Sequence, residues 1–279
     1  MRSGDAKPDL WTMNTGKLIH TKVGGHSVAC RIAGEGPPLA LLHGFLCDSR
    51  CWRPQLEGLA DQFTVLAWDA PGAGLSSDPP DSFTVTDWAH TLAEFLDVAG
   101  FGHAHVLGLS WGGMLAQEFY RLYPARVDRL VLADTYAGWK GSLPNEMVEK
   151  RRARCYLDAT RPAAEVVAEW VPTEFFTNAS KALTAEMGAV VADFHPLGFQ
   201  LMAKALADTD TSSVLSTIKA PTLLLWGEGD LRSPLSVAEQ FHAAIPHSRL
   251  ELIRDAGHVS NMERPDEFNQ SVRRFLLVA

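Results

Sequence analysis

The clearest chemical signal in the chain is a serine set between glycines. Residues 108–112 read Gly-Leu-Ser-Trp-Gly, Gly113 comes next, and a helix-like segment follows at residues 114–123. The apolar pair Val106-Leu107 stands just before the motif and is typical of the end of a strand. A strand, a tight turn flanked by glycine and a helix would lift the Ser110 hydroxyl off the strand end, where a base can reach it. The pattern therefore predicts Ser110 as a nucleophile.

A serine hydroxyl needs further groups to act, because it is a poor nucleophile at neutral pH. It requires a general base, a group that orients the base, and donors for the oxyanion that develops. His258 follows Asp-Ala-Gly at residues 255–257, and Asp230 follows the apolar run 222–226 and a glycine-rich turn. We therefore expect a triad of Ser110, Asp230 and His258, in that order along the chain.

Two other acidic residues remain alternatives for the acid of this triad. Glu228 lies just before Asp230, and Asp134 follows the preceding apolar run. Asp134 is more typical of a cap or a loop anchor. His43 and Asp69 also follow apolar runs, and we interpret them as structural residues of their loops.

Short apolar runs that end in polar residues recur along the chain. Runs this short and continuous are typical of parallel strands that are covered on both faces. Helix-like segments alternate with them, which predicts an α/β fold with a doubly wound, mostly parallel sheet whose strand ends carry the site. The expected helices are residues 87–98, 114–123, 236–244 and 265–277. The expected strands are residues 17–21 and 26–32, joined as a hairpin by Gly24-Gly25, and then 38–42, 63–68, 105–109, 129–133, 222–226 and 250–253.

One segment, residues 136–213, interrupts this alternation because it contains no convincing strand. We expect an α/β core formed by residues 1–135 and 214–279, with 136–213 inserted as a helical cap. The cap is rich in aromatic residues, most of which we expect to pack within it, while the others could line a cavity facing Ser110. Its helix-like patterns are residues 163–170, 182–194 and 199–206.

The composition argues against several classes of partner. The chain has 25 basic and 33 acidic residues, a net charge of −8, which disfavours nucleic acid and anionic membranes. The four cysteines form no C-x-x-C pair and have no histidine cluster beside them, so we expect free thiols and no metal site. No signal peptide and no apolar run of membrane-spanning length is apparent, which predicts a cytoplasmic protein. Residues 1–16 are expected to form a loose arm, and the oligomeric state stays open.

Together, these motifs resemble the α/β-hydrolase superfamily, in its members with a helical cap. The resemblance covers nearly the whole chain, and within the superfamily residues 195–208 and 258–263 are similar to 3-oxoadipate enol-lactonases and related small esterases. It implies Ser110 as the nucleophile, His258 as the general base and then acid, and Asp230 as the residue that orients the imidazole. The supporting stretches are residues 41–45, 69–76, 108–113, 227–234 and 257–265.

The resemblance has three further implications. The backbone N–H groups of Phe45 and Trp111 would form the oxyanion hole. No metal and no organic cofactor is implied. Haloalkane dehalogenases and epoxide hydrolases of this fold use aspartate as the nucleophile, so the serine at position 110 argues against both activities.

The expected function is that of a serine-dependent carboxylic ester hydrolase, an esterase or lactonase. A small ester or lactone would be cleaved through an acyl-enzyme, and the aromatic cap indicates a hydrophobic substrate. Trp139, Leu231 and Val259 are the candidate substrate-binding residues, from their places after the fourth apolar run, beside the acid and beside the base.

Two alternatives would use the same scaffold and stay open. One is a carbon–carbon bond hydrolase of ring-cleavage products, and the other is a ligand receptor with slow turnover. A cationic pocket residue that binds a substrate carboxylate would favour the carbon–carbon hydrolase or an enol-lactonase. Arg151, Arg152 and Arg154 are candidates for it, although an arginine run on a helix is more typical of a solvated face.

Overall fold

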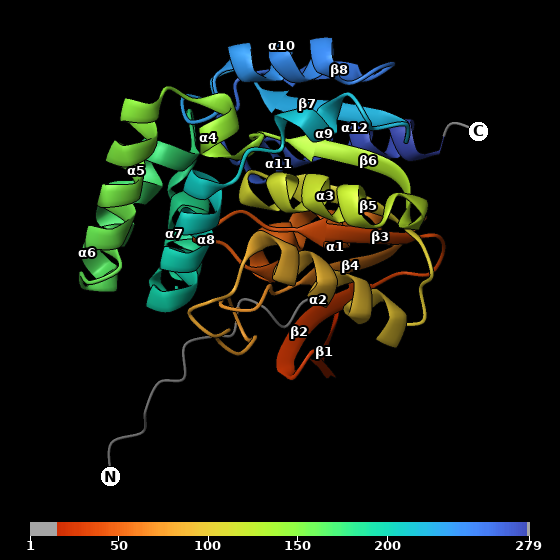
Figure 1. Cartoon of the computed structure of the whole chain (residues 1–279), viewed down its shortest axis with the longest axis horizontal. Helices are drawn as coiled ribbons and strands as arrows, with labels where there is room; N and C mark the ends of the chain where they lie inside the picture. The colour runs from red at the N-terminus through yellow and green to blue at the C-terminus, as the bar shows by residue number, and fades with distance from the viewer. Residues whose placement is uncertain (1–15, 278–279) are drawn as a thin grey trace.

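An eight-stranded sheet forms the centre of the molecule (Figure 1). The computed structural model describes residues 16–277, so the arm expected at residues 1–16 lies outside the described residues, apart from Gly16. The strands are β1 (Lys17–Val23), β2 (His26–Ala33), β3 (Pro38–Leu42), β4 (Thr64–Trp68), β5 (Ala104–Leu109), β6 (Val127–Ala133), β7 (Thr222–Gly227) and β8 (Arg249–Ile253). Their order across the sheet is β1-β2-β4-β3-β5-β6-β7-β8. The pairs β1–β2 and β2–β4 are antiparallel, and all the other neighbouring strands are parallel.

The apolar runs of the sequence explain this sheet. All the expected strands are present, and their ends differ from the expected ones by at most two residues. β7 is buried along its whole length, as a parallel strand covered on both faces must be. The predicted α/β fold with a doubly wound, mostly parallel sheet is confirmed.

Helices cover both faces of this sheet. α2 (Val85–Val98) and α3 (Trp111–Leu122) pack side by side in front of it in Figure 1, and α1 (Arg53–Leu59) packs against α12 (Pro265–Leu276) on its other face. Among the described residues, no helix is both long enough and apolar enough to span a membrane. The other helices of the core are η1 (Ser49–Trp52), η2 (Pro124–Arg126), α9 (Ser212–Leu215), α10 (Leu235–Ala244) and α11 (Ser260–Glu263).

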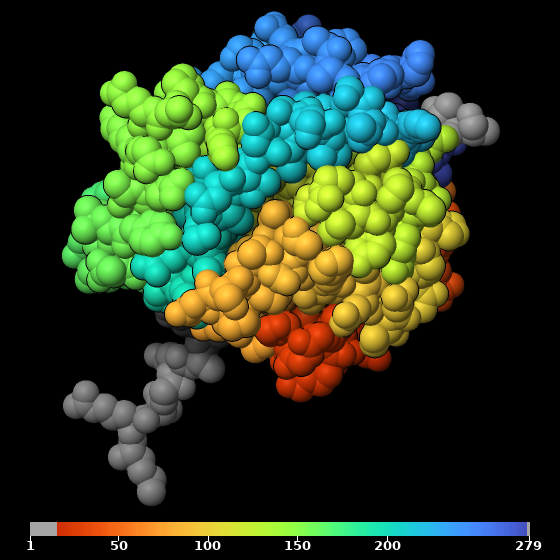
Figure 2. All heavy atoms as spheres, in the orientation of Figure 1, coloured from red at the N-terminus to blue at the C-terminus, as the bar shows by residue number. Residues whose placement is uncertain are grey.

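The segment between β6 and β7 is helical, and its helices gather beyond the ends of the parallel strands (Figure 1). In Figure 2, α4 to α6 form a lobe that projects from the core. We therefore propose residues 136–213 as a cap. The short helix α9 spans the boundary at residue 213. The cap helices are α4 (Gly138–Ser142), α5 (Asn145–Asp158), α6 (Ala163–Trp170), the π-helical η3 (Val171–Phe175), α7 (Lys181–Ala192) and α8 (Pro196–Asp208).

The cap meets the core through ion pairs and one very close backbone contact. Arg53 holds both carboxylate oxygens of Glu186 on α7, at 2.8 and 3.0 Å. On α8, Gly198 lies against Gly72, in the loop after β4. A Cβ at Gly198 would be only 1.8 Å from the Gly72 carbonyl oxygen, so this contact requires glycine.

We predict that Gly198→Ala lowers the free energy of unfolding by about 1–3 kcal/mol, because the new methyl group must push α8 away from Gly72. This steric cost exceeds the gain of about 1 kcal/mol that alanine brings to a helix. Urea unfolding followed by tryptophan fluorescence measures the change. Gly102→Ala is the matched control, since a Cβ there meets no atom within 4 Å. Equal unfolding free energies for the two variants would contradict the contact.

Candidate active site

Ser110 occupies the sharp turn between β5 and α3. Its backbone has φ +54° and ψ −116°, values that residues other than glycine rarely adopt. A Cβ at Gly108 would lie 2.3 Å from the Gly112 carbonyl oxygen, and one at Gly112 would lie 2.1 Å from a carbonyl oxygen of β3. The Ser110 carbonyl accepts a hydrogen bond of 2.5 Å from Thr135 Oγ1. The turn is therefore fixed tightly, with the serine at the end of β5 as the motif predicts.

The structure brings Ser110, His258 and Asp230 together. His258 Nε2 lies 2.8 Å from Ser110 Oγ, and His258 Nδ1 lies 2.8 Å from Asp230 Oδ2. All three side chains are buried. With Nδ1–H donating to the carboxylate, Nε2 is free to accept the serine proton. This arrangement can activate the serine for attack on a carbonyl carbon.

Asp230 is held in place by its own loop. Its Oδ1 accepts hydrogen bonds from the backbone N–H groups of Arg232, at 2.8 Å, and Ser233, at 2.9 Å. The other oxygen, Oδ2, is left for His258. The loop thus fixes both the position and the orientation of this carboxylate.

The two alternative acids do not reach His258. Glu228 is exposed. Asp134 is fully buried, but it accepts hydrogen bonds from Ser260 Oγ at 2.5 Å and from the Gly227 N–H at 2.7 Å. Burial, with the negative charge of Asp230 nearby, raises the pKa of Asp134 well above its usual value. Asp134 therefore anchors the ends of β6, β7 and α11 to one another.

Two backbone N–H groups beside the serine have no acceptor. Trp111 is the first residue of α3, and Phe45 lies in the tight turn after β3; within residues 16–277 neither N–H donates a hydrogen bond. A helix N-terminus favours negative charge. Both groups are therefore available to an oxyanion.

His43 holds the turn that carries Phe45. His43 Nε2 accepts a hydrogen bond from the Ala70 N–H at 3.0 Å, so Nδ1 carries the proton and donates to the Gly44 carbonyl at 2.7 Å. Burial lowers the pKa of His43, which keeps the ring neutral in this role. Asp69 likewise accepts backbone hydrogen bonds from its surrounding loops, at 2.7 Å from Ser49 and 2.9 Å from Leu75.

Aromatic residues of the cap cover the Phe45 side chain. Ring centroids of Trp139, Trp170 and Phe199 lie 6.0, 5.6 and 5.5 Å from that of Phe45. All four side chains are buried. The aromatic residues of the cap thus form an apolar wall next to the serine turn, in addition to packing within the cap.

The three candidate substrate-binding residues have different environments. Trp139 belongs to this apolar wall. Val259 is buried next to His258, and its N–H donates a hydrogen bond to the Phe175 carbonyl. Leu231 is 85% exposed, so it projects into solvent.

A cavity of about 530 Å³ opens beside the apolar wall. Arg151 and Arg154 line it and are half-buried, so they do not form the solvated face that we considered typical. Arg152 points elsewhere and pairs with Glu149 and Asp208. The cavity is also lined by Arg232, which was not among the residues predicted from the sequence. Its place two residues after Asp230 was the available signal.

Within residues 16–277, no group of three or more His, Cys, Asp or Glu side chains is placed to hold a metal ion. The four cysteines are free and buried.

The chain is similar to known proteins in sequence and in fold. A family model described as alpha/beta hydrolase fold matches residues 37–265. A carboxylesterase from Bacillus subtilis (strain 168) is 26% identical over 294 residues, which cover 98% of this chain and 91% of that protein. A malate-bound esterase from Thermogutta terrifontis superposes with a TM-score of 0.85 at 28% identity, covering 94% of this chain and 98% of the other. An enol-lactonase from Burkholderia xenovorans LB400 superposes with a TM-score of 0.86 at 25% identity, covering 93% and 100%.

We predict that Asp134→Asn becomes more stable relative to the wild type as the pH rises from about 5 to about 8. The raised pKa means that the folded protein keeps a proton that the unfolded chain releases near pH 4. Below the pKa that Asp134 has in the unfolded chain, the wild type keeps the full stability linked to this proton. That stability is lost as the pH rises through the pKa of Asp134 in the folded protein. The variant loses nothing over this range, because asparagine does not titrate. Urea unfolding of both proteins across this range measures the difference. A difference that stays constant with pH would contradict the raised pKa.

Proposed function

The chain belongs to the alpha/beta hydrolase fold family, and we propose that it is a serine-dependent carboxylic ester hydrolase, an esterase or lactonase. One observation carries the proposal: the unbroken hydrogen-bonded chain from Ser110 Oγ through His258 to Asp230. The similarity to proteins named carboxylesterase, esterase and enol-lactonase supports the same class of reaction.

In the first half of the reaction, Ser110 Oγ attacks the carbonyl carbon while His258 Nε2 takes the hydroxyl proton. Asp230 stabilises the imidazolium that results, through the 2.8 Å bond to Nδ1. His258 then passes the proton to the leaving alkoxide as the carbon–oxygen bond breaks. In a lactone the leaving oxygen stays attached to the acyl chain, because the broken bond was part of a ring.

In the second half, water attacks the acyl-enzyme and gives a proton to His258. Ser110 leaves with that proton, and the carboxylic acid is released. In both halves the carbonyl oxygen becomes negative, and the vacant N–H groups of Phe45 and Trp111 are the donors that we assign to it. Removal of one such donor typically slows an enzyme of this kind by about 100- to 1,000-fold.

The surroundings favour a small substrate with an apolar part. The wall formed by Phe45, Trp139, Trp170 and Phe199 can pack against an acyl chain or a ring without leaving polar groups unpaired. We retain Trp139, which belongs to this wall, and Val259, which is buried next to His258, as substrate-binding candidates. The exposure of Leu231 places its side chain away from this wall.

We predict that the protein hydrolyses short p-nitrophenyl esters or simple lactones and that Ser110→Ala lowers kcat by at least about 1,000-fold, because the nucleophile is removed. Release of p-nitrophenol across a chain-length series, with titration of the acid from lactones, measures it. Ser236→Ala is the matched control, since this serine is exposed on α10 and should keep full activity.

Folded wild-type protein that turns over no ester and no lactone would contradict the proposal. Hydrolysis that survives Ser110→Ala would contradict the assigned nucleophile. The first outcome would favour the carbon–carbon hydrolase or the receptor, which use the same scaffold.

A further inference from the structure

A buried arginine lies directly over the residue assigned to the oxyanion hole. Arg232 belongs to the loop of the triad acid, and its side chain is only 5% exposed. Its guanidinium carbon lies 5.3 Å from the Phe45 ring centre and 4.8 Å from that of Trp170. A buried cation is costly unless anions and hydrogen-bond acceptors surround it.

The hydrogen bonds of this guanidinium are incomplete. Nη1 donates to Glu174 Oε2 at 2.6 Å. Nε and Nη2 are buried and have no partner among the described residues. These two nitrogens form the edge of a guanidinium that holds both oxygens of a carboxylate at once.

The same edge is occupied at other arginines of this protein. Arg53 uses Nε and Nη2 to hold the two oxygens of Glu186, at 2.8 and 3.0 Å. Arg121 uses them to hold those of Glu118, both at 2.7 Å. Arg232 presents the same edge, but no carboxylate of the described residues accepts hydrogen bonds from it.

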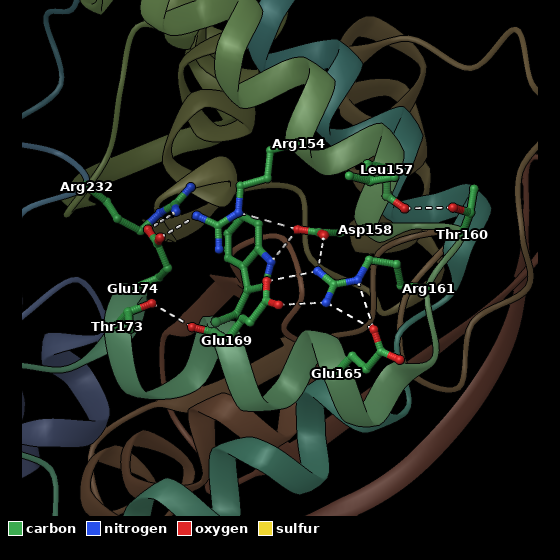
Figure 3. A network of polar contacts seen from close by, with 11 residues as sticks. Arg154, Leu157, Asp158, Thr160, Arg161, Glu165, Glu169, Thr173, Glu174 and Arg232 are labelled. Atoms are coloured by element: carbon green, nitrogen blue, oxygen red, sulfur yellow. Dashed lines mark hydrogen bonds and ion pairs between the residues drawn. The ribbon is translucent and has the colours of Figure 1, made fainter.

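Glu174, the carboxylate that pairs with the Arg232 guanidinium, is shared. Glu174 accepts from Arg232 through Oε2 and from Arg154 Nη1 through Oε1, each at 2.6 Å, so the two arginines converge on it (Figure 3). Burial opposes ionisation of Glu174, but the two guanidinium groups outweigh it and lower its pKa. Glu174 is therefore a carboxylate at neutral pH and is shared between two cations, of which Arg154 also lies 3.5 Å from Asp158 Oδ2.

The cavity beside this group is cationic as a whole. Four cationic side chains, those of Lys150, Arg151, Arg154 and Arg232, line it against two carboxylates, those of Glu146 and Glu174. The whole chain, in contrast, has a net charge of −8. A local excess of positive charge in an acidic protein attracts an anion to this place.

Side-chain contacts link the lining of this cavity to the triad. Arg151 donates to the Tyr136 hydroxyl and to the Arg232 carbonyl, each at 3.0 Å. The ring of Tyr136 lies 6.3 Å from that of His258. Arg232 itself donates its backbone N–H to Asp230, and its guanidinium lies over the Phe45 ring, so an anion that it binds would lie close to the reacting centre.

We propose that Arg232 binds a carboxylate carried by the substrate, so that the preferred substrates are anionic esters or lactones, such as half-esters of short dicarboxylic acids. The carboxylate would occupy the Nε and Nη2 edge, and the chain between it and the scissile carbonyl would lie along the Phe45 and Trp170 rings. This proposal rests on the proposed function and narrows it to one class of substrate.

The test compares two ethyl esters that differ only at the end of the acyl chain, monoethyl glutarate and ethyl pentanoate, with their next homologues. The wild type should favour the anionic ester by about 10- to 100-fold in kcat/KM, the range expected for hydrogen bonds to a charged group. Arg232→Gln should bring the ratio of the two kcat/KM values close to 1, mainly through KM. Arg232→Lys should restore part of the ratio, because it keeps the charge without the two-nitrogen edge.

Each variant is judged by the ratio of its kcat/KM values for the two esters. A general loss of folding or activity lowers both values equally and leaves this ratio unchanged. Arg274→Gln is the matched control, since it removes one positive charge from outside the cavity and should keep the wild-type ratio. A wild-type ratio near 1, or a ratio that survives Arg232→Gln, overturns the proposal.

A binding measurement separates this proposal from the proposed function. Calorimetric titration of monoethyl glutarate into the Ser110→Ala protein needs no turnover. Binding should be at least about 10-fold tighter than that of ethyl pentanoate, should weaken with added salt, and should lose this margin when Arg232→Gln is added. Equal binding of the two esters overturns the anion site whether or not the wild type hydrolyses them. Selective binding without any hydrolysis supports the site and contradicts the ester hydrolase.

Discussion

The strained backbone of Ser110 is held in place by the ends of neighbouring strands. A residue with a side chain at φ +54° costs of the order of 1–3 kcal/mol, and it persists because its surroundings leave no alternative. Gly112 packs against β3, and Thr135, just after β6, holds the Ser110 carbonyl. The same turn makes Trp111 the first residue of α3, which leaves its N–H without an intrahelical acceptor. One local constraint thus positions the hydroxyl and also frees one of the donors beside it.

The loops of the acid and the base are both tied to the cap. Arg232 donates hydrogen bonds from its backbone N–H to Asp230 and from its side chain to Glu174, so one residue joins the proposed triad acid to η3. On the other side, Glu263 accepts hydrogen bonds from the Gly257 N–H, just before the base, and from the Thr177 N–H in the cap. The proposed cap therefore packs over the candidate site and also stabilises the two loops on which the geometry of His258 depends. A shift of the proposed cap would therefore change the geometry of His258 and Asp230 as well as the shape of the cavity.

The sequence carried enough information to predict the core and to group the three side chains proposed as a triad. Continuous apolar runs identify parallel strands, and the polar residues that follow them share one edge of the sheet. This is why Ser110, Asp230 and His258 can be grouped from the sequence. The roles of Asp134 and Asp230 could not be separated in this way, because both follow strands; the hydrogen bonds of each decide. The helix α1 was missed because it is only seven residues long and too short for a periodic pattern.

The cationic cavity was only partly predictable. An arginine run on α5 is compatible with a solvated face or with a cavity, and only the three-dimensional packing of the cap on the 227–234 loop decides between them. Arg232 is separated from Glu174 by more than fifty residues of sequence, and no local pattern reports that the two meet. Contacts of this kind depend on how the inserted segment docks, which is a property of tertiary packing rather than of periodicity.

Covalent labelling tests the central claim, an activated serine at position 110, most directly. An alkyl fluorophosphonate reacts with an activated serine Oγ, forming a phosphorus–oxygen bond and expelling fluoride. Mass spectrometry of the intact protein, followed by peptide mapping, should show one adduct, located on the peptide that contains Ser110. Labelling should be lost in Ser110→Ala and greatly slowed in His258→Ala. Folded wild-type protein that stays unlabelled, or that is labelled at another residue, would contradict the proposed mechanism.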